Sequence, residues 1–509
     1  MRRALIAGPW LAALASAGAT QPVARSPGPE AVAVTVYRAP NRGANESMNL
    51  RWLNGFALVT ETRRVSIPAG DSDVRFEGVA GGILPESAIV SGFPEGVREK
   101  NQDAWLLSPA SLLDASLGRR VHLRRTSALT GAVRETEAVI RSGAAGAVVL
   151  ETPDGIESLR CDGLRSTLLY DRVPAGLSAK PTLSVRVRSP RAVRATVTLS
   201  YIAAGFDWQA NYVARLSPDG GRMDLFAWLT LANGDETGFR EADTQAVAGR
   251  LNRSSNAPAR PRAPPLVLRC WPSGTTTSDL EEQQIEKEEI VVTGSRAAAM
   301  MAPPPPPPAP PPPPAMMARQ EDLGDLKLYR IPERVTVAAR SQKQVALLQR
   351  PSVKVDSVYR QRVAASEPSR SGKVMRVLVT RNDSASGLGL PLPSGKVALF
   401  GAASGRTILM GRGALDDRAV GERVEIVAGT ASSVTSILSL LPGTTGAREV
   451  EIVVANSRDV PIRYEAELDT GHLRLVPGTE LPLRDGRPLW SVTVPANGRA
   501  TLRYRLESR

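Results

Sequence analysis

The sequence has few of the side chains that most often carry catalytic chemistry. Its 509 residues include two histidines, His122 and His472, and two cysteines. General acid–base catalysis and zinc binding usually draw on histidine, and neither histidine stands in a pattern with metal-ligand spacing. Both are expected on strand surfaces. We therefore predict no catalytic residue, no metal site and no cofactor.

Recognisable catalytic motifs are also missing. The chain has no nucleophile-elbow serine, no HExxH motif, no P-loop and no dinucleotide-binding glycine motif. The prediction is accordingly a protein that is not an enzyme. One enzymatic alternative stays open, a glycan hydrolase, because two carboxylates can meet in space without leaving a spacing pattern.

Long apolar runs and aromatic residues are scarce too. After the N-terminal segment no apolar stretch approaches the ~18 residues that a membrane helix needs, so we expect no transmembrane helix in the mature chain. Phe, Trp and Tyr make up 4% of the chain, and none stands among the clustered arginines Arg119, Arg120, Arg124 and Arg125. Binding of single-stranded nucleic acid needs such interleaved rings, so no nucleic-acid partner is predicted.

The positive charge is carried almost entirely by arginine. Only eight of the 64 basic residues are lysine, and the formal net charge is +13. Most arginines stand singly in strand-like segments, as expected of solvated strand faces. A basic surface also suits a polyanionic envelope surface. Binding to lipopolysaccharide or phospholipid head groups, weakening steeply with salt, therefore stays open as an alternative.

The N-terminus has the pattern of an export signal. Arg2 and Arg3 precede an apolar run from Ala4 to Ala17, and A-x-A cleavage sites follow. This order is typical of a secretory signal peptide. We predict a signal peptide at residues 1–19 and an exported protein that is periplasmic or associated with the outer membrane.

The two cysteines leave the disulfide state open. An even pair in an oxidising compartment favours a disulfide, and Cys161 and Cys270 are the only candidates. The alternative is two unpaired thiols, because separation in sequence says nothing about the distance between the Cα atoms.

Alternation of apolar and polar residues dominates the rest of the chain. Residues 183–188 and 195–201 alternate strictly and are expected to pair as an antiparallel hairpin, and the pattern returns at 462–468 and 502–506. The predicted fold class is all-β, mainly antiparallel, with several β-sandwich or small-barrel modules and a disordered proline-rich insert.

Capping and turn residues refine this pattern. The clearest helix is short, with Ser108 as N-cap, a proline at its first position and Gly118 after its end. Asp154 and Gly155 indicate a hairpin turn between two short apolar segments. The segment Asn233-Gly234-Asp235 is interpreted as another hairpin turn rather than a calcium loop.

Composition and turn signals divide the mature chain into five regions. They are an N-terminal β module at 30–118, a small β-barrel or hairpin module at 119–180, the first half of a larger β region at 181–253, an acidic and proline-rich insert at 254–320, and the second half with a β-sandwich-like C-terminus at 321–509.

The insert has the composition of a disordered spacer. Eleven of the twelve residues from Pro303 to Pro314 are proline, and six acidic residues lie between Asp279 and Glu289. Proline runs adopt polyproline II, and charged segments stay solvated. The alternative is a tolerated loop insertion at a sheet edge.

Aromatic residues concentrate before the insert. Phe206, Trp208, Tyr212, Phe226 and Trp228 lie close together in an otherwise aromatic-poor chain. Sugar-binding faces use such rings, but here apolar residues occupy both faces of the strand around Phe226 and Trp228. Core packing is therefore the predicted role.

Several segments resemble one bacterial envelope family, the domain of unknown function 4139, whose members include mucoidy-inhibitor-like proteins. They are AGFDWQANYVARL, DLFAWLTLANGDETGF and TQAVAGRLN within 201–252, then LGDLKLYRIPERVTVAARSQKQVALL, LPSGKVALF and the terminal NGRATLRYRL. The resemblance covers most of residues 30–509. It implies a β-rich envelope protein and assigns no site residue. Relatives often carry a coiled coil between the halves, but this chain has no heptad run there.

A second resemblance lies in the insert. EEIVVTGSR, at 288–296, is similar to the start of the plug in TonB-dependent outer-membrane receptors, a region that a periplasmic TonB-type protein can capture by strand addition. The candidate docking strand is Ile290, Val291, Val292 and Thr293, whose β-branched side chains suit edge pairing.

Together these features predict an exported, non-catalytic β-rich scaffold or binding protein of the bacterial cell envelope with one or more envelope protein partners. The alternatives are a TonB-linked accessory protein that docks through residues 288–296 and a glycan hydrolase.

Deletion of residues 288–296 tests the docking alternative. If this segment adds a strand to a TonB-type protein, crosslinking in cells followed by mass spectrometry should recover that partner with the intact chain and lose it with the deletion. Recovery of the same partners by both forms would remove the docking alternative.

Overall fold

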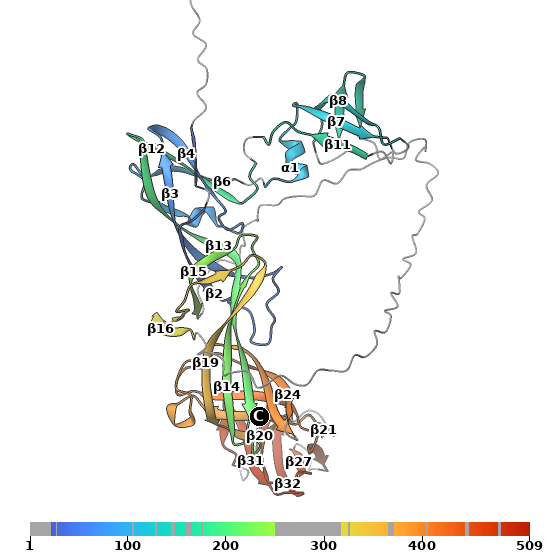
Figure 1. Ribbon diagram of the computed structural model, residues 1–509. Helices are drawn as coiled ribbons and strands as arrows, with labels where there is room; N and C mark the ends of the chain where they lie inside the picture. The colour runs from blue at the N-terminus through green and yellow to red at the C-terminus, as the bar shows by residue number, and fades with distance from the viewer. Residues whose placement is uncertain are drawn as a thin grey trace, which may run out of the picture. The chain divides into compact units, whose positions relative to one another are not determined.

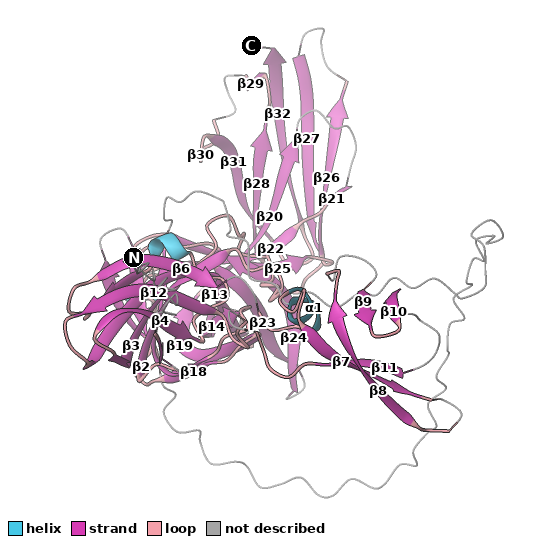
Figure 2. Ribbon diagram, turned by 90° about the horizontal axis from the view of Figure 1, so that it is seen from above, coloured by secondary structure: helices cyan, strands magenta, loops and turns pink. Residues whose placement is uncertain are grey.

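The computed structural model describes residues 22–508 except 27, 104–105, 128–129, 144–147, 159–164, 175–176, 250–316, 324–325, 365–370, 404–405, 443–446 and 477–479. In these residues the fold is almost entirely β, with several mainly antiparallel sheets (Figure 1 and Figure 2). The predicted all-β class is confirmed.

Several predicted features lie outside the described residues: the signal peptide at 1–19, the cysteines Cys161 and Cys270, the docking strand Ile290 to Thr293, and nearly all of the insert at 254–320. Strand β16 (Arg319–Leu323) begins inside the range predicted for the insert. No described helix is long and apolar enough to cross a membrane.

The chain divides into two compact units that are not contiguous in sequence. Unit 1 contains the described residues up to Val32 and those from Thr60 to Ile202, and unit 2 contains Ala33–Val59 and the described residues from Ala203 onward. The predicted module at 30–118 is therefore divided. The reason is strand pairing, because β2 (Ala31–Tyr37) pairs in parallel with β15 (Phe239–Ala248).

Unit 1 contains a four-stranded sheet in the order β1-β4-β12-β6. Its alternating residues point to opposite faces as predicted, and Leu183, Val185 and Val187 are buried. The predicted hairpin of 183–188 with 195–201 was wrong. Strand β12 pairs antiparallel with β4 and β6, because alternation fixes the buried face and leaves the partner open. The bounds are β1 (Val23–Ser26), β4 (Gly70–Glu77), β6 (Val97–Asp103) and β12 (Thr182–Ser189).

A second part of unit 1 joins the short helix to a sheet in the order β10-β9-β8-β7-β11. Helix α1 (Pro109–Asp114) has the predicted N-cap, with a reciprocal capping box between Ser108 and Ser111. The hairpin at Asp154 and Gly155 also forms. Consecutive hairpins thus build this module, whose strands are β7 (Arg120–Thr126), β8 (Val133–Ile140), β9 (Val149–Thr152), β10 (Gly155–Ser158) and β11 (Arg165–Leu169).

Long strands run along unit 2 in the order β16-β17-β15-β2-β3-β13-β14-β19, with β23 parallel to β13 and β24 antiparallel to β23. Strands β3 and β13 also contribute residues to unit 1, where β5 (Ile89–Ser91) follows a 3-10 turn at Pro85–Ser87 and pairs with β13. The remaining bounds are β3 (Gly55–Ile67), β13 (Val193–Leu216), β14 (Arg222–Asn233), β17 (Leu326–Arg330), β18 (Val335–Val337), β19 (Ser341–Lys354), β23 (Gly395–Ala403) and β24 (Arg406–Leu415).

The turn predicted at Asn233-Gly234-Asp235 does not close a hairpin. Strands β14 and β15 on either side are not neighbours in the sheet. The side chains instead order the connecting loop, because Asn233 Oδ1 accepts from the Asp235 amide and Asp235 Oδ1 accepts from the Thr237 amide. Asx turns of this kind serve any tight loop, so the tripeptide did not specify a hairpin.

The C-terminal part of unit 2 is a β-sandwich. A sheet in the order β25-β22-β20-β28-β31-β30 packs on one in the order β21-β26-β27-β32-β29 (Figure 2), and residues such as Tyr464, Ile452 and Leu506 fill the core between them. This arrangement agrees with the β-sandwich modules of the predicted fold class. The strands are β20 (Asp356–Ala364), β21 (Ser371–Gly372), β22 (Met375–Arg381), β25 (Arg423–Thr430), β26 (Val434–Leu441), β27 (Ala447–Asn456), β28 (Ile462–Asp469), β29 (Leu473–Leu475), β30 (Leu483–Arg484), β31 (Arg487–Val494) and β32 (Arg499–Ser508), with a 3-10 turn at Ser384–Ser386.

Two glycines allow β24 to pass against β25. A Cβ on Gly411 would overlap the Ala428 carbonyl oxygen, and one on Gly413 would overlap the Val427 carbonyl oxygen. Strand β25 bulges here, because its register with β22 shifts by one residue at Ala428. The close passage therefore needs glycine at both positions.

Substitution of Gly411 by alanine tests this passage. The added methyl group must push β24 away from β25, so we expect Gly411→Ala to lower the free energy of unfolding by about 1–3 kcal/mol in urea titrations. Gly28→Ala is the matched control, because a Cβ there meets open space. Equal stability of the two variants would contradict the proposed role of the glycine.

A candidate anion-binding pocket

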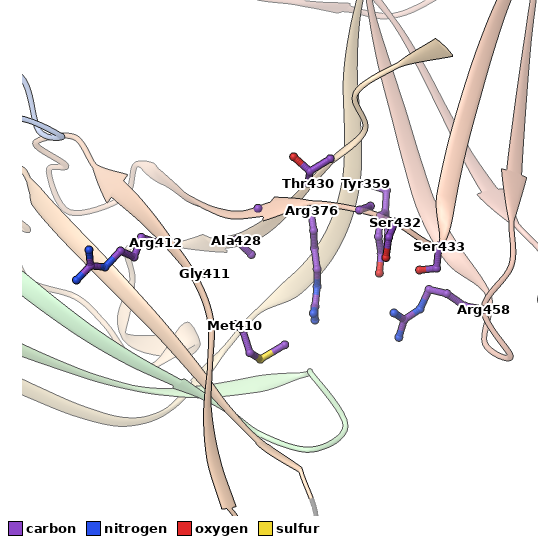
Figure 3. A pocket seen from close by; sticks show the side chains of 12 residues that line it. Tyr359, Arg376, Met410, Gly411, Arg412, Ala428, Thr430, Ser432, Ser433 and Arg458 are labelled. Carbon is purple, nitrogen blue, oxygen red and sulfur yellow. The ribbon is translucent and has the colours of Figure 1, made fainter. Parts of the chain in front are cut away.

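A pocket of about 300 Å³ opens in unit 2 beside the crossing of β24 and β25. Strands β20, β22, β24 and β25 and the loops before β26 and β28 supply its walls (Figure 3). Three arginines and several hydroxyl groups line it, and no aspartate or glutamate does. The lining residues are Tyr359, Arg376, Met410, Gly411, Arg412, Ala428, Gly429, Thr430, Ala431, Ser432, Ser433 and Arg458.

Backbone hydrogen bonds hold Arg458 at one wall of the pocket, and its guanidinium group has an unused hydrogen-bond donor. Its amide donates to Asn456 Oδ1 at 3.0 Å, and its carbonyl oxygen accepts from the Asn497 amide at 2.9 Å. The guanidinium carbon lies 6.0 Å from the centre of the Tyr359 ring, a cation–π distance. Its Nε atom is buried and has no hydrogen-bond partner in the described part of the chain. An unpaired buried donor is costly, so this atom favours a bound acceptor.

Arg376 reaches the same space from the neighbouring sheet strand. It stands directly opposite Tyr359 in the pairing of β22 with β20. Its Nε and Nη2 atoms donate to Ser357 Oγ at 3.2 and 3.0 Å, which holds the half-buried side chain in place. Figure 3 shows Arg376 and Arg458 extending into one space above Met410, while the guanidinium of Arg412 points away from it.

Hydroxyl groups complete the polar lining. Thr430 ends β25, and Ser432 and Ser433 lie in the following loop. The Ser433 carbonyl oxygen accepts from the Ser457 amide at 2.8 Å, so this loop is tied to the loop that carries Arg458. Guanidinium and hydroxyl donors around one space suit a phosphate, sulfate or carboxylate group. The arrangement is therefore chemically an anion site.

On the opposite face of the same sheet, arginine side chains form ion pairs with glutamates. Arg360 donates to both oxygens of Glu425 at 2.6 and 2.9 Å and to Glu465 Oε2 at 2.9 Å, and Arg484 also donates to Glu465. The Glu465 side chain is fully buried. Burial opposes its ionisation, but the hydrogen bonds from Arg484 and Arg360 outweigh burial and lower its pKa to about 2.

This network bears on the glycan-hydrolase alternative. Carboxylates do converge in space, as that alternative requires, but Arg360 binds both Glu425 and Glu465. For Glu425, too, the hydrogen bonds from Arg360 outweigh the opposing effect of burial and lower the pKa. A glycosidase needs one carboxyl group with a raised pKa as its acid, so this pair gives the alternative no support.

The two histidines lie apart from the pocket residues in sequence. His122 is on β7, with Nδ1 3.3 Å from Glu135 Oε1 and Nε2 3.3 Å from Asp171 Oδ1. His472 lies in the turn before β29 rather than on a strand. Among the described residues no group of three or more histidine, cysteine, aspartate or glutamate side chains could hold a metal ion.

The aromatic cluster divides between core and sheet face. Phe206, Trp208 and Tyr212 are buried as predicted, and Trp208 Nε1 donates to the Val247 carbonyl oxygen at 2.8 Å. Phe226 and Trp228 are half-buried and form an edge-on pair with ring centres 4.8 Å apart. The prediction of full core packing holds for three of the rings and overstates the burial of this pair.

Sequence reasoning missed the pocket. It treated the arginines as solvated strand residues, and Arg376 and Arg458 stand in strand and loop segments that look like those of any ion-paired arginine. What distinguishes them is the absence of acidic residues from the lining of the pocket that they share. That absence depends on register, for which the sequence pattern gives no signal.

The pH dependence of stability tests the Glu465 network. Because the folded-state pKa is about 2, the stabilisation is complete above the ordinary glutamate pKa of about 4.3 and is lost as pH falls toward 2. We expect urea titrations to show a loss of about 2 kcal/mol over this range. Glu465→Gln should be less stable at pH 7 and lack that component. Exposed Glu480 provides the control, since Glu480→Gln should keep the wild-type profile, and an unchanged profile in Glu465→Gln would contradict the assignment.

Comparisons with known proteins give no relative from which a site could be transferred. A scan against protein-family models found no match, and a search of curated proteins found none either. The resemblance to the domain of unknown function 4139 stays a prediction from the residues quoted above.

Proposed function

We propose that this protein is an exported, non-catalytic β-rich scaffold of the bacterial cell envelope that binds an anionic group between Arg376 and Arg458. One observation carries the proposal: Arg458 has a buried Nε atom with no partner in the described residues, in a pocket without acidic lining. Export rests on the sequence alone, through the signal peptide pattern of residues 1–19.

The energetics favour an anion over a neutral ligand. Hydrogen bonds to charged groups contribute about 1.5–3 kcal/mol each, and two guanidinium groups can donate several of them to one phosphate. Arg376 and Arg458 are held in place before binding by Ser357 and by the Tyr359 ring. Side chains that are already ordered lose less entropy when the ligand binds. Partial exposure of the pocket leaves the interaction sensitive to salt.

Calorimetry with inorganic phosphate tests the proposal. The protein used is the chain without residues 1–19, compared with Arg458→Gln and Arg376→Gln. We expect each substitution to weaken phosphate binding about tenfold or more, equivalent to the loss of one charge-assisted hydrogen bond, and the wild-type affinity to fall with added salt.

The control is Arg505→Gln, which removes the same charge from an exposed strand position. It should bind phosphate like the wild type. Equal weakening by Arg505→Gln would reduce the effect to net charge, and undetectable phosphate binding by the wild-type chain would overturn the proposed pocket.

A further inference from the structure

The hairpin of β23 and β24 presents apolar side chains to solvent beside the pocket. Near its end Gly401 pairs with Ile408, and Ala403 pairs with Arg406. Ile408, Leu409 and Met410 are 48%, 51% and 42% exposed. Large apolar side chains scattered singly are ordinary on protein surfaces, but a contiguous group marks an interaction site.

Both faces of this hairpin end are uncovered in the described structure. Successive residues of a regular strand point to opposite faces, so the exposure of both Ile408 and Leu409 requires both faces to be open here. Met410 follows them at a bulge in the pairing with β23. Strand β24 has no strand partner other than β23 among the described residues. The apolar tip, defined here as Ile408, Leu409 and Met410, is therefore not part of a sheet core.

The charges on the hairpin are all of one sign. Its two strands contain Lys396, Arg406 and Arg412 and no acidic residue. Arg406 and Arg412 are exposed on either side of the apolar tip. Met410 also lines the anion pocket, so the apolar tip adjoins the pocket that contains Arg376 and Arg458.

Apolar residues flanked by basic ones match the boundary of an anionic membrane. Hydrocarbon at the boundary accepts the apolar side chains, and the negative surface attracts each basic residue with about 1 kcal/mol. A protein partner or a second copy of the chain could cover the apolar tip. Neither explains why two arginines in the adjoining pocket are available to bind a small anion. A lipid phosphate accounts for both features.

We propose that the apolar tip inserts into the surface of an anionic lipid membrane while Arg376 and Arg458 bind a lipid phosphate. The phosphate part of this inference rests on the proposed function. The apolar tip makes a separate contribution, so the two parts can fail independently.

Cosedimentation with lipid vesicles tests the inference, using the same chain without residues 1–19. Vesicles of phosphatidylcholine alone are compared with vesicles that also contain phosphatidylglycerol. We expect binding to the anionic vesicles that is about tenfold or more stronger than to the neutral ones and that weakens with salt. Absence of binding to the anionic vesicles would overturn the inference.

Serine substitutions separate the apolar tip from the pocket. The double variant Ile408→Ser and Leu409→Ser changes exposed side chains, so it should fold, bind inorganic phosphate like the wild type and lose vesicle binding about tenfold or more. Ile156→Ser is the control, because Ile156 is another exposed apolar strand residue, in unit 1. Vesicle binding that survives in the double variant would overturn insertion of the apolar tip.

Two further outcomes identify which part fails. If phosphate binding is absent but vesicle binding depends on the apolar tip, the pocket proposal fails and insertion of the tip is supported. The second outcome combines two results: light scattering shows a dimer for the wild-type chain and a monomer for the double variant, and both bind vesicles equally well. The apolar tip would then be an interface between copies, which overturns the inference.

Discussion

The contact between the backbones of β24 and β25 determines the position of the groups around the pocket. Because Gly411 and Gly413 have no side chains, β24 can lie directly on the carbonyl groups of the bulged strand. Met410, next to Gly411, thereby lines the same pocket as Arg376 of the sandwich. The pocket and the apolar tip thus share Met410 of β24.

Strand alternation explains why charged pairs and unpaired arginines occur in the same sheet. Tyr359 and Arg360 are adjacent on β20 and therefore point to opposite faces. On the Arg360 face, Glu425 and Glu465 neutralise the guanidinium groups. On the Tyr359 face stands Arg376, opposite a glycine of β25 and without acidic neighbours in the pocket lining. A one-residue shift in register would exchange these environments.

Structural features that depend on a residue and its neighbours in the chain could be predicted from the sequence. Alternation identified the β class, and the Ser108 cap identified the short helix. Partner choice could not be predicted, because β12 has the same apolar face whether it pairs with β13 or with β4. The pocket could not be predicted for the same reason, because Arg376 and Arg458 line one pocket only through the pairing of distant strands. The features of the insert and the cysteines remain predictions from the sequence.

The two loops that meet at the pocket are also the places where the chain changes sheets. The loop with Ser433 leads from β25 to β26, and the loop with Arg458 leads from β27 to β28, so each joins one sheet of the sandwich to the other. One backbone hydrogen bond, between Ser457 and Ser433, connects them. An anion held by both loops would form a reversible link between the two sheets of the sandwich. Its binding energy would add to the stability of the folded domain, so the resistance of this domain to unfolding would report how much anion its surroundings contain.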